Sequence, residues 1–334
     1  MSETKKILKI EDLTVHYDTE NGIVRAVNGI NITLDHKEAL GLVGETGAGK
    51  TTTALSMLRL IPDPPGRIVS GSIEIDGLDL MSKTESELEK IRGKDVAMIF
   101  QDPMTALNPV FPVGEQIAES IRIHEHVSYQ EAMERANEML EIVGIHRERA
   151  KDYPHQLSGG MKQRVVIAIA LACHAKLLIA DEPTTALDVT IQAQVLELIK
   201  EYRERYHTSL LMITHDLGIV AETCDRVAVM YAGNIVEQGT LRDVFNHTLH
   251  PYTEGLFASL PNINDRAARL NSIPGTVPDP TKIPDGCVFA PRCSYAADNC
   301  IKSPQRDNWV SESHMVRCSR YEEPSFKIIR GNAT

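Results

Sequence analysis

Short runs of hydrophobic residues recur along the chain, and each is followed by a polar or glycine-rich turn. The clearest are ALGLV (39–43), VAMIF (96–100), LLIA (177–180) and LLMI (210–213). Unbroken apolar runs of this length are typical of strands buried on both faces, as in a parallel sheet. Helical spacing lies between them, and residues 128–144 begin with a capping box of Ser128 and Glu131. This alternation predicts an α/β fold with a mainly parallel sheet.

The two ends of the chain differ in pattern from this middle part. Alternating apolar and polar positions with turn residues occur at 8–17, 26–34 and 71–77. They predict an antiparallel sheet layered against the main one. Residues from about 104 to 172 have a mostly helical pattern, which predicts a helical insertion between two parallel strands. After residue 245, prolines stiffen a linker-like stretch, so we expect one domain at 1–245 and a smaller extension at 246–334.

The charge balance and the hydrophobic runs exclude some classes of protein. The 334 residues carry a formal net charge of −11 without a dense run of Lys or Arg, which counts against a nucleic-acid binder. The N-terminus has no apolar leader segment. The longest apolar run, 165–180, is interrupted by His174 and Lys176 and is too short to cross a bilayer. We expect a cytosolic protein whose role at a membrane would need separate chains.

The segment GETGAGKT (44–51) matches the phosphate-binding pattern G-x-x-x-x-G-K-[ST]. Glycines let backbone N–H groups point at phosphate oxygens, and the helix that starts near Gly49 turns its positive dipole end toward them. Lys50 is expected to reach the β- and γ-phosphates, and the Thr51 hydroxyl to bind Mg²⁺. The predicted nucleotide contacts here are Gly44, Glu45, Thr46, Gly47, Ala48, Gly49, Lys50, Thr51 and Thr52. The preceding strand and following helix disfavour an ordinary glycine-rich turn.

Polar side chains follow three further predicted strands at the same edge of the sheet. They are Asp181 and Glu182 in LLIADEP, His215 in LLMITHD and Gln101 in VAMIFQ. In open α/β sheets, ligands bind at the carboxyl ends of the strands. Asp181 can hold the Mg²⁺ shell, and Glu182 can accept a proton from an attacking water. Acidic residues often end strands for structural reasons, but the shared edge favours a catalytic site.

The stretch QLSGGMKQRVVIAIAL (156–171) lies just before the DEP strand. With it, the chain resembles an ABC ATPase, the nucleotide-binding subunit of an ABC transporter. The family's motifs follow in order over about residues 5 to 245, as P-loop 44–51, Q-loop Gln101, signature 157–161, Walker B 177–182, D-loop Ala186–Asp188 and H-loop His215. Tyr17 stands where the family has the aromatic residue that stacks on adenine. The resemblance implies a RecA-like core with an antiparallel β subdomain and a helical subdomain.

The signature segment carries a second predicted anion site. Ser158 is a good N-cap, and its hydroxyl acts together with the N–H groups of Gly159 and Gly160. The resemblance implies that this site faces the γ-phosphate held by the opposite subunit, so that ATP joins two ATPase subunits head to tail. Met161 departs from the commonest signature, which ends in Gln, but the phosphate-facing residues are intact.

The resemblance also implies roles at the sheet edge. Glu182 is the general base, and His215 orients the γ-phosphate. Gln101, together with Thr51 and Asp181, belongs to the Mg²⁺ site and links that site to the helical insertion, which touches the membrane partner.

The C-terminal part is similar to one branch of importers. HPYTEGLFASLP (250–261), SIPGTVPDP (272–280) and GCVFAPRC (286–293) resemble the dipeptide and oligopeptide ABC ATPase subunits. This implies a subunit at the cytoplasmic face of the membrane that powers peptide uptake. Its partners would be two permease subunits, a second ATPase subunit, identical or a sister chain, and indirectly an extracytoplasmic peptide-binding protein. The alternatives are an importer of another solute such as nickel and a soluble ABC ATPase without a transporter.

Four cysteines crowd the last fifth of the chain, at Cys287, Cys293, Cys300 and Cys318. In a reducing cytosol, four such thiolates could hold Zn²⁺ or a [4Fe–4S] cluster, and the family resemblance favours the cluster. Arg292 and Arg317 each precede a candidate ligand, and we expect their charge to lower thiol pKa values. Four unligated thiols would be prone to oxidation, and a nucleic-acid-binding zinc module would need a basic stripe with aromatic residues that this tail lacks.

Overall fold

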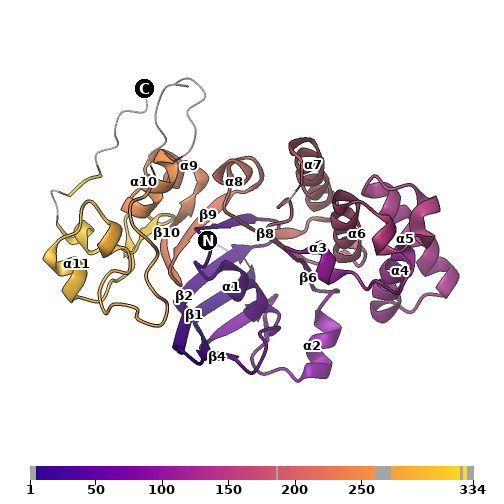
Figure 1. Ribbon diagram of the computed structural model, residues 1–334, viewed down its shortest axis with the longest axis horizontal. Coiled ribbons are helices and arrows are strands. Elements are labelled where there is room, and N and C mark those ends of the chain that lie inside the picture. The colour runs from indigo at the N-terminus through magenta and orange to yellow at the C-terminus, as the bar shows by residue number, and fades with distance from the viewer. Residues whose placement is uncertain (1–4, 186, 260–271, 324–325, 329–334) are drawn as a thin grey trace.

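The computed structural model describes residues 5–185, 187–259, 272–323 and 326–328. Within them, an eight-stranded sheet has the order β11-β12-β10-β9-β3-β8-β7-β6, and a four-stranded sheet has the order β2-β1-β4-β5. Figure 1 shows the sheets in the middle of an elongated molecule, with a helical part at one end and the C-terminal region at the other. Three residues of the expected motifs lie outside the described residues. They are Ala186 of the D-loop and Leu260 and Pro261 of the importer-like stretch.

The middle of the larger sheet is parallel and buried. Its strands are β3 (Ala39–Val43), β6 (Val96–Ile99), β7 (Leu177–Asp181), β8 (Ser209–Thr214) and β9 (Arg226–Tyr231). Parallel pairing joins β6 to β7, β7 to β8, β8 to β3 and β3 to β9. Successive residues of each strand point into two different hydrophobic cores, one on each face. This explains why the strands are continuous apolar runs, and the predicted α/β fold is confirmed.

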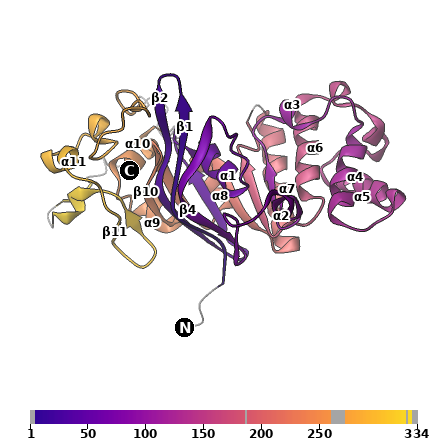
Figure 2. The same cartoon turned by 90° about the horizontal axis from the view of Figure 1, so that it is seen from below.

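The smaller sheet is antiparallel, as expected from the N-terminal segments. It consists of β1 (Lys6–Thr19), β2 (Gly22–Asp35), β4 (Gly66–Ile75) and β5 (Leu78–Asp79). Ile10, Ile32 and Ile73 share one core with Ala54 and Met57 of helix α1 (Lys50–Met57). Figure 2 shows this sheet between the helical part and the C-terminal region. The helix that carries the phosphate-loop lysine is therefore held by both sheets.

The helical part occupies the range in which an insertion was expected. It contains α3 (Pro103–Ala106), α4 (Val113–His124), α5 (Tyr129–Ile142), η1 (Arg147–Lys151), η2 (Pro154–Gln156) and α6 (Gly159–Leu171). Ser128 caps α5 by accepting a hydrogen bond from the Glu131 N–H at 3.2 Å. The other helices of the central region are α2 (Glu85–Ile91), α7 (Val189–Tyr206) and α8 (Leu217–Thr223). No helix in the described part of the chain is long and apolar enough to span a membrane.

The C-terminal region extends the main sheet. β10 (Asn234–Thr240) pairs antiparallel with β9, β12 (Met315–Val316) pairs with β10, and β11 (Asn308–Trp309) pairs with β12. Between these strands lie α9 (Leu241–Asn246), α10 (Pro251–Ala258), η3 (Ala290–Arg292) and α11 (Asp298–Lys302), and η4 (Ser319–Glu322) follows. Residues beyond the expected boundary at 245 thus complete the sheet of the residues before it.

Candidate functional site

The phosphate-loop motif forms a tight loop between β3 and α1, and this loop requires glycine. Gly47 and Gly49 have φ angles of 81° and 102°, which residues with a Cβ rarely adopt. A Cβ on Gly49 would lie 2.4 Å from the backbone oxygen of Ala26, and a Cβ on Gly44 would lie 2.1 Å from that of Met230. The neighbouring backbone of β2 and β9 therefore leaves no room for larger residues in the loop.

Lys50 is the first residue of α1, and its side chain turns back onto the loop. Its Nζ donates hydrogen bonds to the backbone oxygens of Gly44 at 2.7 Å and Glu45 at 3.2 Å. Burial lowers the pKa of Lys50, and the carboxylates of Glu182, Asp181 and Glu45 act in the opposite direction. The ammonium group is thus within electrostatic reach of both acidic residues at the end of β7.

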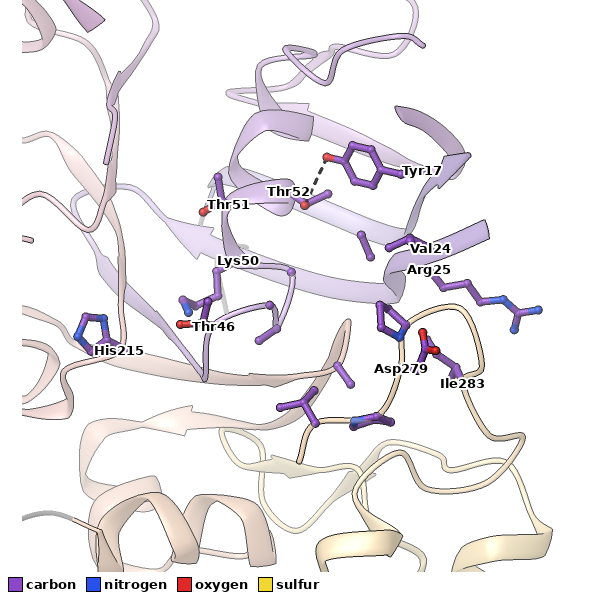
Figure 3. Close-up of a pocket in the computed structure, with 18 of the residues that line it drawn as sticks. Tyr17, Val24, Arg25, Thr46, Lys50, Thr51, Thr52, His215, Asp279 and Ile283 are labelled. Atoms are coloured by element: carbon purple, nitrogen blue, oxygen red, sulfur yellow. Dashed lines mark hydrogen bonds between the residues drawn. The ribbon is translucent and has the colours of Figure 1, made fainter. Parts of the chain in front are cut away.

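A cavity of about 690 Å³ opens over the loop, which is within the range of small-molecule sites. Of the predicted site residues, it is lined by Tyr17, Thr46, Gly47, Ala48, Gly49, Lys50, Thr51, Thr52, Gln101, Glu182 and His215. Figure 3 shows Lys50, Thr46 and His215 on one side of this cavity and Arg25, Asp279 and Ile283 on the other. The fold therefore brings together the P-loop, the Q-loop and H-loop residues and the aromatic Tyr17, whose hydroxyl lies 3.5 Å from the Thr52 Oγ1.

Asp181 lies behind this lining, with only 1% of its surface exposed. Burial raises its pKa, and a hydrogen bond with Thr51 partly counteracts this. Its Oδ1 is buried without a hydrogen-bond partner among the described residues. Carboxylate and hydroxyl oxygens are ligands that Mg²⁺ accepts. The pair of Thr51 and Asp181 therefore fits a Mg²⁺ ion, which would satisfy the orphaned oxygen.

Three donors hold the carboxylate of Glu182 at the rim of the cavity. It accepts hydrogen bonds from Gln101 Nε2 at 3.0 Å and Thr185 Oγ1 at 2.9 Å, and its Oε1 lies 3.2 Å from His215 Nδ1. Burial raises the pKa of Glu182, but the hydrogen bonds from Thr185 and His215 outweigh it and hold the pKa below its ordinary value. The backbone of Glu182 has a φ angle of 46°, a left-handed conformation that is strained for this residue.

The signature residues lie outside the cavity. Ser158 caps α6, and its Oγ accepts a hydrogen bond from the Met161 N–H at 3.4 Å. Gly159 and Gly160 form the first turn of the helix, and a Cβ on Gly159 would meet nothing within 4 Å. None of the three is among the described residues that line the cavity. The structure thus places the two predicted anion sites apart.

A segment that sequence reasoning missed forms part of the cavity wall. Val277, Pro278, Asp279, Pro280 and Ile283 line it opposite the phosphate loop. The Arg25 N–H of β2 donates a hydrogen bond to the backbone oxygen of Pro280 at 3.0 Å. The only signal in the sequence was the proline-rich texture of this stretch, which predicts a stiff linker but not what the linker touches.

Comparison with known proteins assigns the chain to a family. Two family models match it: ABC transporter over residues 27–185, and Oligopeptide/dipeptide transporter, C-terminal region, over residues 236–300. The chain is 50% identical to the oligopeptide transport ATP-binding protein AppD of Bacillus subtilis (strain 168), across 95% of this chain and 97% of that protein. It is 49% identical to OppD of the same strain, across 95% of this chain and 89% of that protein. The chain belongs to the ATP-binding subunits of the oligopeptide/dipeptide ABC transporters.

Solved structures agree with this assignment. A dimeric ATP-binding cassette in a post-hydrolysis state with ADP and Pi is 27% identical to the chain with a TM-score of 0.65. The match covers 70% of this chain and 99% of that cassette. The predicted ABC ATPase fold is therefore confirmed, and the remaining 30% of the chain lies outside the match.

The metal site predicted in the tail of this oligopeptide-transporter ATPase is not confirmed. All four cysteines have free thiols, and the Cys287 N–H donates a hydrogen bond to the Cys300 backbone oxygen at 2.7 Å. Burial raises the pKa of Cys293 to about 11 and of Cys318 to about 12, and the neighbouring cysteines add to both shifts. The thiols thus lie close enough to influence one another. However, no group of three or more His, Cys, Asp or Glu among the described residues is arranged to hold a metal ion.

The expected roles of two arginines near these cysteines are also corrected. Arg292 pairs with Glu45 of the phosphate loop at 2.8 Å, and Arg317 pairs with Asp307 at 2.6 Å. The arginine that lowers the pKa of Cys293 is Arg320, which is distant from it in sequence. Adjacency in sequence was a poor guide here because side chains of successive residues in an irregular segment point in different directions.

Proposed function

We propose that this oligopeptide-transporter ATPase binds and hydrolyses ATP to power the uptake of di- and oligopeptides through a separate membrane permease. The single observation that carries the proposal is the position of Glu182. It lies at the rim of a nucleotide-sized cavity next to the P-loop, with its carboxylate held by Gln101 and His215. The relatives named above are oligopeptide transport ATP-binding proteins, which supports the same substrate class.

Each group of residues in the cavity has its own role in this proposal. The N–H groups of Gly47 and of Gly49 to Thr52 and the Lys50 ammonium bind the phosphates, and the Tyr17 ring packs on the base. Thr51, Gln101 and Asp181 would hold Mg²⁺, which when bound neutralises developing charge on the phosphates. Glu182 accepts the proton of the attacking water, because it lies at the rim of the cavity. Its lowered pKa keeps the carboxylate ionised at neutral pH. His215 orients the γ-phosphate.

A second ATPase subunit completes the site. Ser158, Gly159 and Gly160 lie outside the cavity of their own chain, so they are available to the phosphates held by another. The compared cassette is dimeric, which supports a head-to-tail pair made with a second copy or a sister chain. The helical part that follows Gln101 contacts one of two permease subunits at the cytoplasmic face of the membrane. An extracytoplasmic protein delivers the peptide, and no nucleic acid takes part.

Reconstitution tests the proposal. The chain is combined in liposomes with the two permease subunits, the second ATPase subunit and the peptide-binding protein. We expect ATP-dependent accumulation of labelled peptide, and none with Lys50→Ala, because that variant loses the phosphate-binding cation. Accumulation of nickel but not of peptide would favour the alternative solute, and hydrolysis without accumulation of either would contradict a transport function.

For the tail, we propose that Cys287, Cys293, Cys300 and Cys318 hold a structural [4Fe–4S] cluster. The resemblance of the tail to the dipeptide-type subunits and the backbone hydrogen bond between Cys287 and Cys300 support this ligand set. The thiols would have to move together when the cluster binds, because their present arrangement in the described part of the chain does not hold a metal ion. Protein purified without oxygen should be brown with a broad visible absorbance, and the colour should be lost in Cys300→Ser but kept in Cys173→Ser, which changes a cysteine outside the tail. Colourless protein with stoichiometric zinc would refute the cluster, and protein without metal would refute both ligands.

A further inference from the structure

A partly buried ion pair joins the C-terminal region to the phosphate loop. Arg292 Nη1 donates to Glu45 Oε2 at 2.8 Å, and Nη2 donates to Oε1 at 3.2 Å. The Arg292 side chain is only 6% exposed. Two parallel hydrogen bonds between guanidinium and carboxylate are directional as well as strong. The side chain of Glu45 therefore has one defined orientation.

Glu45 is also tied to the P-loop through its backbone. Its N–H donates a hydrogen bond to the Tyr252 hydroxyl at 2.9 Å, and its carbonyl accepts one from the Lys50 Nζ at 3.2 Å. The Tyr231 hydroxyl lies 3.3 Å from Arg292 Nη1 and connects the same group to β9. Whatever moves Arg292 must therefore move the loop that surrounds Lys50.

The same arginine also contacts the residues just before the cavity wall. Its Nε donates to the backbone oxygen of Pro274 at 2.9 Å, and its Nη2 to that of Ile273 at 3.3 Å. Three residues further along, Val277 enters the cavity wall, which continues to Ile283. Figure 3 shows Ile283 beside Arg25, on the side of the cavity away from His215. One guanidinium thus contacts both the phosphate loop and the residues that lead into the wall segment opposite it.

We propose that Arg292 is a positioning residue for nucleotide binding. It fixes the position of the P-loop, which binds the triphosphate, relative to the wall at 277–283, which contacts the nucleoside. The inference rests on the proposed function, because it takes this cavity as the ATP site. Arg292 does not touch the reacting atoms, and Glu182 and His215 keep their own partners without it. Its loss should therefore raise the Kd and KM for ATP and leave kcat at saturating ATP nearly unchanged.

The test uses the full chain and measures Kd for MgATP by equilibrium dialysis, with ATPase kinetics alongside. Arg292→Gln is compared with Arg135→Gln, a matched control in which a partly buried arginine of the helical part loses a bidentate ion pair with Glu125. We expect about a tenfold rise in Kd for Arg292→Gln and less than about a twofold rise for the control. Arg292→Lys should not restore affinity, because an ammonium cannot make the bidentate contact.

Three further variants make the test independent of any folding defect of Arg292→Gln. Glu45→Gln should raise Kd by a similar factor, and the double variant should be no worse than either single one, since both remove one interaction. Ile283→Ala should weaken binding of ATP but not of inorganic tripolyphosphate, which has no nucleoside. The inference is overturned if Arg292→Gln binds ATP like the control, or if the two effects add. Failure of the unsubstituted chain to bind MgATP would overturn the proposed function, and this inference with it.

Discussion

The chemistry of single residues centres on Glu182. Its carboxylate has three neighbouring donors, and two of them, Gln101 and His215, come from the ends of other strands. The left-handed backbone at Glu182 is strained, with a φ angle of 46°. Such strain persists where the surrounding structure over-determines a conformation, which is common at functional sites. The arrangement is the one expected if Glu182 is the proton acceptor that we propose.

Glu182→Gln should therefore separate binding from hydrolysis. The amide keeps the shape of the side chain but cannot accept the proton of the attacking water. We expect MgATP binding to be retained and the rate of phosphate release to fall by about 10²- to 10⁴-fold. Glu201→Gln, on the exposed side of α7, serves as the control and should have the rate of the unsubstituted chain. A near-normal rate in Glu182→Gln would show that another group is the base.

The P-loop and the strand-end residues could be predicted because their signal is local. Glycines in a fixed pattern, and polar residues directly after apolar runs, are visible in a few consecutive positions. The contact of Arg292 with Glu45 could not be predicted, because 247 positions separate the two residues. Nothing in the neighbourhood of either residue identifies its partner. The hydrogen bond that Gln101 donates to Glu182 could not be predicted either, because it depends on which strands pair in the sheet.

Secondary-structure elements are joined by a second charged cluster away from the cavity. Asp76, which follows β4, pairs with Lys5 at 2.7 Å and with Lys176 at 2.9 Å, just before β7. Lys176 also pairs with Asp95 at 3.0 Å, just before β6. Hydrogen bonds from Lys5 and Lys176 lower the pKa of Asp76 from 3.8 to about 2. The cluster thus ties the antiparallel sheet to the edge of the main sheet.

Asp76→Asn should reduce stability in a pH-dependent way. A carboxylate whose pKa is depressed in the folded state stabilises the protein above its unfolded pKa, and this contribution is lost as pH falls through the folded pKa. We expect a loss of about 0.5–1 kcal/mol in the free energy of unfolding at neutral pH, since the cluster is partly exposed. The difference from the unsubstituted chain should shrink between about pH 4 and pH 2. Urea unfolding at several pH values measures it.

Asp298→Asn is the control for this experiment, because Asp298 forms an ion pair with Lys302 that is almost fully exposed. It should change stability little at any pH. An Asp76→Asn effect that is constant down to pH 2 would contradict the assignment, since it would then reflect something other than the charge of the carboxylate. Asn tolerates the positive φ of 49° at this position, so backbone strain does not confound the comparison.

At the scale of elements, the prediction depended on length. The strands β3, β6, β7 and β8 were predicted because each is a run of four or more buried apolar or polar residues. The strand β9 was not predicted, although it has five buried residues in succession. β11 and β12 have two residues each, too few for a periodic pattern. The C-terminal residues were therefore expected to form a separate extension. In the structure, β12 pairs with β10, because an exposed sheet edge favours an added strand wherever the chain returns to it.

For the molecule as a whole, the decisive feature is that the two anion sites of one chain do not meet. The P-loop faces the cavity, whereas Ser158 begins α6 outside it. If each nucleotide is held between the P-loop of one chain and the signature of another, defects in the two motifs should complement each other. Lys50→Ala disables the first motif and leaves the signature intact, and Ser158→Arg does the reverse.

Mixing these two variants should restore ATP hydrolysis that neither has alone. In a mixed pair, one composite site combines the intact P-loop of Ser158→Arg with the intact signature of Lys50→Ala, and the other site carries both defects. Random pairing at equal concentrations gives half mixed pairs, so about a quarter of the unsubstituted activity is expected if the sites work independently. Each variant mixed with itself is the control. If the subunit pairs only with a sister chain, every pair is mixed. Ser158→Arg in this chain and the matching P-loop change in the sister then place both defects in one site and leave the other intact, so about half of the unsubstituted activity is expected. Hydrolysis per chain that is independent of dilution, together with no recovery on mixing, would contradict a shared site, because a site complete within one chain has nothing to gain from a partner.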